Sequence, residues 1–75
     1  MLKLLIADDE LIIRQGMRRM ISWESMGIIL AGEAETFSET LEKIRQLRPD
    51  IVLCDIRMPG GTGLDVIHEV KQSMP

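Results

Sequence analysis

The sequence has 75 residues, 45% of them hydrophobic and 28% charged, with a net charge of −3; this is typical of one small globular domain and excludes a disordered or fibrous chain. No apolar run approaches the ~20 residues of a transmembrane helix, and the mild acidity argues against a nucleic-acid surface, which needs clustered Lys and Arg. The single cysteine, Cys54, excludes an internal disulfide and is typical of a reducing compartment, so we expect a cytoplasmic protein that contacts neither membrane nor nucleic acid directly.

The chain begins with a short apolar run, residues 2–7, which predicts a buried strand and is followed by Asp8, Asp9 and Glu10. Residues 10–22 predict a helix capped by Asp9, because apolar side chains recur there at helical spacing. These apolar positions are Ile13, Met17, Met20 and Ile21. We expect the basic side chains of this helix to face mostly solvent, namely Arg14, Arg18 and Arg19.

A loop over residues 22–27 precedes the second strand, and Gly27 suits a positive φ at its end. The second strand is expected over residues 28–31, extending as far as residue 33. Thr36 and Glu39 then have the spacing of a capping box, which predicts the start of a second helix. We expect that helix to end at Arg48, because Pro49 disfavours helical backbone in the residue before it.

The third strand is predicted over residues 51–55, a continuous apolar run that ends on a carboxylate, Asp55. Met58 and Pro59 follow, and then three glycines, so the chain turns sharply. A third helix is expected over residues 64–70, reaching as far as residue 74. Its predicted caps are Thr62 and Asp65.

Three strand–helix units in succession predict an α/β fold with a parallel sheet and right-handed crossovers. If the first and third strands are neighbours, the strand order is 2-1-3 and the first two helices cover opposite faces. The gap between those two strands is then the switch point where α/β proteins bind ligands. We therefore expect Asp8, Asp9 and Asp55 to meet there.

Three carboxylates in one crevice repel one another by about 1 kcal/mol per pair at ~4 Å in bulk water, and by about 4 kcal/mol at an effective dielectric of ~20. Hard oxygen ligands of this kind suit Mg²⁺, and a carboxylate beside Mg²⁺ can attack phosphorus to form an acyl phosphate. The alternative is purely structural: Asp8 or Asp9 only caps a helix and Asp55 only forms a turn.

At three places the sequence resembles the receiver domain of bacterial two-component response regulators: residues 5–10, 32–34 and 49–64. The resemblance covers the whole chain and implies a flavodoxin-like fold in which Asp55 accepts a phosphoryl group from a sensor histidine kinase. It further implies that Asp9, Asp55 and the backbone carbonyl of Arg57 ligate Mg²⁺, while Asp8 acts through a metal-bound water. Residues 22–27 are similar to receivers joined to an AraC-type helix-turn-helix output, so a transcriptional output in another domain is expected.

The sequence also departs from this family. A receiver has five strand–helix units, and this chain supplies three, so we expect residues 1–75 to be a partial, N-terminal receiver domain. The family's switch Ser or Thr and its Lys, which follow the fourth and fifth strands, have no counterpart here. The resemblance thus covers the acidic half of the family's site without its cationic half.

A third strand without a neighbour on its outer side presents an unpaired edge, which templates pairing with another chain. We therefore expect a homodimer or higher association, formed edge to edge through residues 51–55 or by a rearranged domain swap. We also expect an apolar strip left uncovered on the first helix. Two other functions remain open. One is a non-signalling fragment that dimerises and never takes phosphate. The other is a Mg²⁺-dependent phosphohydrolase with an aspartyl nucleophile, although such enzymes place two acids two residues apart, whereas Asp8 and Asp9 are contiguous. The leading interpretation is a signalling module and not an enzyme.

Overall fold

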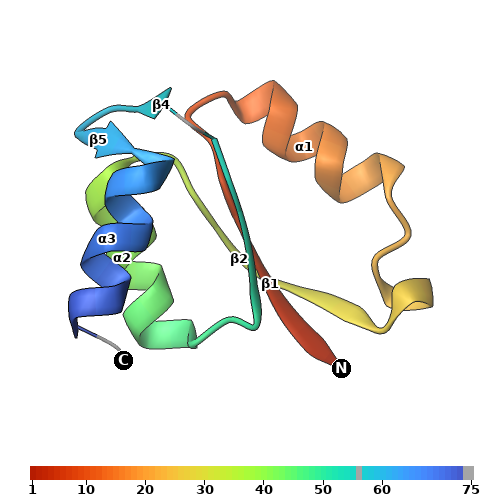
Figure 1. The fold of residues 1–75 in the computed structure, drawn as a ribbon. Coiled ribbons are helices and arrows are strands. Elements are labelled where there is room, and N and C mark those ends of the chain that lie inside the picture. Colours follow the sequence, from red (N-terminus) through yellow and green to blue (C-terminus); the bar gives the residue numbers. More distant parts are fainter. Residues whose placement is uncertain (56, 74–75) are drawn as a thin grey trace.

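The computed structural model describes residues 1–55 and 57–73 (Figure 1). The order of elements is β1 (Leu2–Ala7), α1 (Leu11–Met20), the short 3-10 helix η1 (Glu24–Met26), β2 (Ile28–Ala34), α2 (Phe37–Leu47), β3 (Ile51–Cys54), β4 (Arg57–Met58), β5 (Gly61–Thr62) and α3 (Gly63–Ser73). Among these residues no helix is both long and apolar enough to cross a membrane.

Strands β1, β2 and β3 form a parallel sheet in the order β2-β1-β3, as predicted. Ala7, at the end of β1, lies opposite Ala34 of β2 and Cys54 of β3, so the three strands end at one edge. Helix α1 covers one face of the sheet, and α2 and α3 lie side by side on the other (Figure 1). The predicted placement of the first two helices on opposite faces is therefore confirmed.

The core has two layers because side chains alternate across β1. Leu5 and Ala7 pack with side chains of α2 and α3, including Ile44 and Val66. Leu4 and Ile6 point to the other face and pack with Ile28, Met17 and Trp23. All four β1 side chains are essentially inaccessible to solvent, as expected for the central strand of a parallel sheet.

Helix α1 differs from its prediction in the face that it turns to the sheet. Arg14 is buried with 8% of its surface exposed, whereas Ile12 and Met20 are 80% and 85% exposed. Of the four apolar positions predicted to face inward, Met17 packs against the core, while Ile13, Met20 and Ile21 are exposed. The expected apolar strip on α1 is therefore present, but the expectation that Arg14 faces solvent was wrong.

The predicted cap of α1 was also wrong. The N-cap residue is Glu10, without a side-chain cap hydrogen bond, and not Asp9. Instead Asp8 Oδ1 accepts a hydrogen bond of 2.9 Å from the backbone N–H of Glu10. Asp8, one residue before the predicted cap, thus stabilises the turn that leads into the helix.

The other caps follow the sequence more closely. Thr36 Oγ1 accepts from the N–H of Glu39 at the start of α2, and Arg48 ends this helix with a φ of +47° directly before Pro49. At α3, Thr62 and Asp65 hydrogen-bond reciprocally, as a capping box requires. These bonds from the backbone and side chain of Thr62 lower the pKa of the Asp65 carboxyl.

The observed boundaries of β2 and β3 differ from the predicted ones by a few residues. β2 continues to Ala34 because its end pairs with the end of β1, and β3 ends at Cys54, which leaves Asp55 just outside the strand. The hairpin of β4 and β5 was not predicted. Its signal was the Pro59-Gly60 pair, which suits the two central positions of a type II turn, and Gly60 has a φ of +94°.

Gly61 in this hairpin lies against Phe37, the first residue of α2. A Cβ added at Gly61 would lie 2.6 Å from Cδ1 of that ring. We expect Gly61→Ala to lower the free energy of unfolding by about 1–3 kcal/mol through overpacking, measured by urea denaturation. Gly16→Ala is the control: nothing lies within 4 Å of its added Cβ, and alanine favours a helix by up to ~1 kcal/mol, so this variant should be more stable. Equal stability of both variants would contradict the prediction.

Candidate metal centre

The two acids that end neighbouring strands are placed by backbone hydrogen bonds at the carboxyl edge of the sheet. The N–H of Asp8 donates to the carbonyl of Ala34 at 2.9 Å, and the N–H of Asp55 donates to the carbonyl of Ala7 at 2.8 Å. Both acids therefore continue the strand pairing one step beyond the strands themselves. This places their side chains in the crevice between β1 and β3, where the topology predicted a site.

Asp8, Asp9 and Asp55 meet in this crevice, as predicted. One carboxylate oxygen of each lies within 4.8 Å of the others. Asp8 is nearly buried at 9% exposure, Asp55 is half-buried and Asp9 is exposed. The cluster is thus open to solvent on the side of Asp9 and closed on the side of the sheet.

The three carboxylates have no direct ion-pair partner among the described residues. Within residues 1–55 and 57–73, no lysine or arginine side chain forms an ion pair with any of the three carboxylates. Converging hard oxygen donors without a cationic partner are the donor set that Mg²⁺ prefers. The residues present therefore fit a divalent cation such as Mg²⁺.

The predicted third direct ligand is the backbone carbonyl of Arg57, which belongs to β4 directly after the crevice. Its role stays a prediction, and Ile56 before it lies outside the described residues. The loop around it is anchored to the core. Met58 is buried among side chains of α2 and α3, and the carbonyl of Pro59 accepts a hydrogen bond from the N–H of Phe37 at 3.0 Å.

Cys54 lies beside the acidic cluster, directly before Asp55 in the chain. Burial raises the pKa of its thiol, and the charges of Asp55 and Asp8 raise it further. The thiol Sγ donates to the carbonyl of Asp55 at 3.4 Å. Because the protonated thiol is a poor nucleophile, we assign Cys54 a structural role at the end of β3.

Sequence reasoning missed Arg14, whose guanidinium reaches the backbone of Asp8. The available signal was the pair of acids at the end of the second strand, Glu33 and Glu35, since a parallel strand 2-1-3 order brings them beside the end of the first strand. Both lie within ion-pair distance of Arg14.

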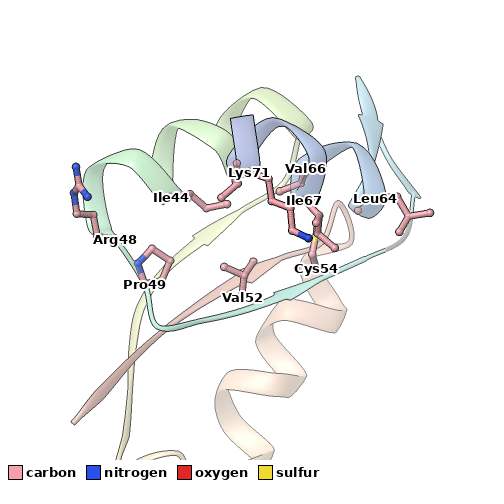
Figure 2. A pocket seen from close by; sticks show the side chains of 11 residues that line it. Ile44, Arg48, Pro49, Val52, Cys54, Leu64, Val66, Ile67 and Lys71 are labelled. Carbon is pink, nitrogen blue, oxygen red and sulfur yellow. The ribbon is translucent and has the colours of Figure 1, made fainter. Parts of the chain in front are cut away.

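A separate groove of about 560 Å³ lies between α2, α3 and β3 (Figure 2). Val52 and Cys54 point into it from β3, and Val66 and Ile67 line it from α3. Arg48 and Lys71 are its charged lining residues, and it contains no carboxylate. It is therefore an apolar surface and not a cation site.

The chain is similar in sequence to a known protein family and to several of its members. A family model described as "Response regulator receiver domain" matches residues 4–75. The uncharacterized transcriptional regulatory protein YesN of Bacillus subtilis is 47% identical over 75 residues, covering the whole of this chain and 20% of YesN. The response regulator GacA of Pseudomonas syringae is 39% identical over 75 residues, covering the whole of this chain and 35% of GacA.

A solved structure of a response regulator domain has a similar fold. The REC domain of AraT, a response regulator from Geobacillus stearothermophilus, superposes with a TM-score of 0.90 at 38% identity, covering 99% of this chain and 57% of that one. The chain therefore spans a fifth to about a third of these curated relatives and a little over half of this solved domain.

Proposed function

Because this chain belongs to the response regulator receiver family, we propose that it takes a phosphoryl group from a sensor histidine kinase onto Asp55, with Mg²⁺ held by the acidic cluster. The observation that carries this proposal is the convergence of the three carboxylates within 4.8 Å at the carboxyl ends of β1 and β3. In this role the chain is a signalling module whose own aspartate is modified, and not an enzyme acting on a separate substrate.

The proposed roles follow from position. Asp9 and Asp55 offer the more accessible oxygens and would ligate Mg²⁺ together with the carbonyl of Arg57, while Asp8 would act through a metal-bound water. Bound Mg²⁺ supplies positive charge to the phosphoryl oxygens. An oxygen of Asp55 forms the new O–P bond as the N–P bond of the kinase phosphohistidine breaks. The histidine nitrogen keeps that electron pair and takes up a proton.

We also propose the setting in which this module acts. Residues 1–75 would form the N-terminal part of a receiver in a cytoplasmic regulator. Its output would be transcriptional, through a DNA-binding domain of the AraC type; this is supported by the similarity to YesN, which is named a transcriptional regulatory protein, and by the segment around Trp23.

The test is the intact mass of the chain after incubation with Mg²⁺ and a small acyl-phosphate donor. We expect a gain of one phosphoryl group that requires the donor and disappears when a chelator removes Mg²⁺. A folded chain that binds Mg²⁺ but gains no mass would contradict phosphoacceptance. It would favour the second candidate, a fragment that associates without signalling.

The open edge of β3 supports that self-association. Among the described residues β3 pairs only with β1, so its outer backbone groups are a template for another strand. The accessible surface is 5035 Å², whereas about 4,650 Å² is typical of a folded monomer of 8.5 kDa. We propose that a second copy pairs with this edge, because antiparallel pairing of two identical strands is closed by a two-fold axis.

We expect light scattering at high protein concentration to give the mass of a dimer. Leu53→Lys, which places a charge on the partly exposed side chain of β3, should shift the equilibrium toward monomer by at least about tenfold, the effect of roughly 1.4 kcal/mol. Ile12→Lys is the matched control on the exposed strip of α1 and should leave the dimer intact. If Ile12→Lys dissociates the dimer and Leu53→Lys does not, the contact lies on α1 and the β3 proposal fails.

A further inference from the structure

Arg14 is buried at the junction of three elements. It projects from α1 toward the ends of β1 and β2, with 8% of its surface exposed. Its Nη1 donates a hydrogen bond of 2.6 Å to the backbone carbonyl of Asp8, and its Nε donates one of 3.2 Å to Glu33 Oε1. Its Nη2 lies 3.8 Å from Glu35 Oε2. The guanidinium fork therefore contacts three separate groups.

The pairing explains why this charge can be buried. A buried guanidinium is costly unless it is paired and hydrogen-bonded. Glu33 and Glu35, at and just after the end of β2, supply the opposite charges. They hold the fork in one orientation, and the remaining donor is directed at the Asp8 carbonyl. The network thus links β2 to the backbone of the acidic cluster.

The group that Arg14 holds is the peptide between two of the three clustered acids. The Asp8 carbonyl belongs to the Asp8–Asp9 peptide, which is planar, so holding its oxygen also orients the N–H and Cα of Asp9. Asp8 is further fixed by its own N–H, which donates to Ala34, and by its Oδ1, which accepts from Glu10. Asp9 is exposed and makes no side-chain hydrogen bond in the described residues. Its direction therefore depends on the peptide that Arg14 holds.

We infer that Arg14 is a positioning residue for divalent-cation binding: through the Asp8 carbonyl it orients the Asp8–Asp9 peptide so that both carboxylates converge with Asp55. This inference rests on the cation site of the proposed function. It does not depend on phosphoryl transfer. Removing a group that hydrogen-bonds to metal ligands and orients them typically weakens metal binding by about 10- to 100-fold.

The sign of the effect separates positioning from simple electrostatics. Arg14 carries a positive charge close to the site, so removing it should tighten cation binding if only Coulomb attraction mattered. Removing a positioning group should weaken binding instead. Arg14→Met keeps much of the length and the apolar stem of the side chain but deletes the guanidinium group. The direction of its effect on cation affinity therefore distinguishes positioning from Coulomb repulsion.

Arg18 provides the matched control. Its Nη1 donates to Glu33 Oε2 at 2.8 Å, so it shares an acidic partner with Arg14, but it is half-exposed and, among the described residues, forms no hydrogen bond or ion pair with Asp8. Arg18→Met therefore makes the same charge change and disturbs the same glutamate. A loss of binding in Arg14→Met alone therefore does not arise at Glu33 and reports the contacts that Arg14 makes and Arg18 does not, with the Asp8 carbonyl and with Glu35.

The experiment titrates Mn²⁺ into the whole chain and follows free Mn²⁺ by electron paramagnetic resonance, with circular dichroism to check folding. We expect Arg14→Met to weaken Mn²⁺ binding by about 10- to 100-fold and Arg18→Met to leave it unchanged or slightly tighter. Arg14→Lys keeps the charge but has no planar fork, so its affinity should fall between those of the unaltered chain and Arg14→Met. Should Arg14→Met fail to fold, the Arg14→Lys result decides.

The two proposals can fail separately. No Mn²⁺ binding by the unaltered chain would overturn the cation site and this inference with it. Mn²⁺ binding by Arg14→Met, or by Arg14→Lys where that variant decides, that equals or exceeds binding by the unaltered chain would overturn the positioning role alone. Equal losses in Arg14→Met and Arg18→Met would also overturn it, because the shared effect would then lie at Glu33.

Discussion

Asp55→Asn is expected to abolish the donor-dependent gain of one phosphoryl group completely. The amide has nearly the shape of the carboxylate but lacks the anionic oxygen that forms the acyl phosphate. The fold should be retained, because the hydrogen bond that places residue 55 runs from its backbone N–H to Ala7 and not from its side chain. Intact mass spectrometry of both proteins, treated identically with Mg²⁺ and donor, measures the effect.

Asp50→Asn is the matched control for this variant. Asp50 precedes the opposite end of β3, where its carboxylate accepts from the N–H of Lys3, far along the strand from the acidic crevice. The same substitution there should leave the mass gain intact. A phosphoryl group still acquired by Asp55→Asn would mean that another carboxylate is the acceptor, and peptide mapping would distinguish Asp8 from Asp9.

Asp9→Asn is expected to change stability in opposite directions with and without metal. Without a divalent cation the substitution removes one of three converging charges, and relief of repulsion should stabilise the fold by about 1 kcal/mol at low salt, since Asp9 is exposed to solvent. With Mg²⁺ at ~100 times its dissociation constant, the unaltered chain should gain about 2.7 kcal/mol. The variant should gain little, because it has lost a ligand. Urea unfolding in Mg²⁺ and in chelator measures both effects.

Glu42→Gln controls for the loss of an acidic charge as such. Glu42 lies on the exposed side of α2 and contacts Gln46, away from the crevice. Its replacement should change neither the metal-free stability nor the stabilisation by Mg²⁺ by more than about 0.5 kcal/mol. A metal-free Asp9→Asn variant less stable than the unaltered chain would show that Asp9 has a structural role, as the original capping prediction held. Stabilisation by Mg²⁺ that survives in Asp9→Asn would remove it from the ligand set.

Much of the fold could be predicted because its signals are local. The capping pairs at Thr36 and Thr62 are each formed within four residues, and both were found where the sequence placed them. The strand of residues 51–54 was recognisable because it is a continuous apolar run, which is typical of a strand in a parallel sheet, although its side chains are only partly buried here. Alternation of strands and helices then restricted the topology to a few arrangements, of which the 2-1-3 order is observed.

The errors concern features that depend on distant partners. Helical spacing identified α1 but not the face that it buries, because Ile13 and Met20 give the same periodic signal whether or not anything packs on them. The β4–β5 hairpin carried a local signal in Pro59-Gly60, but its position depends on Phe37 and on the burial of Met58 between α2 and α3.

The sequence by itself determined the parallel sheet, the strand that carries each acid and the meeting of Asp8, Asp9 and Asp55, because consecutive strands of one direction end at one edge. Only the tertiary structure decided that Arg14 turns inward to hold the Asp8 carbonyl. The physical reason is that a charge is buried only where opposite charges pair with it, and Glu33 and Glu35 lie at and just after the end of β2, about twenty residues further along the chain. Periodicity within one helix contains no information about that pairing.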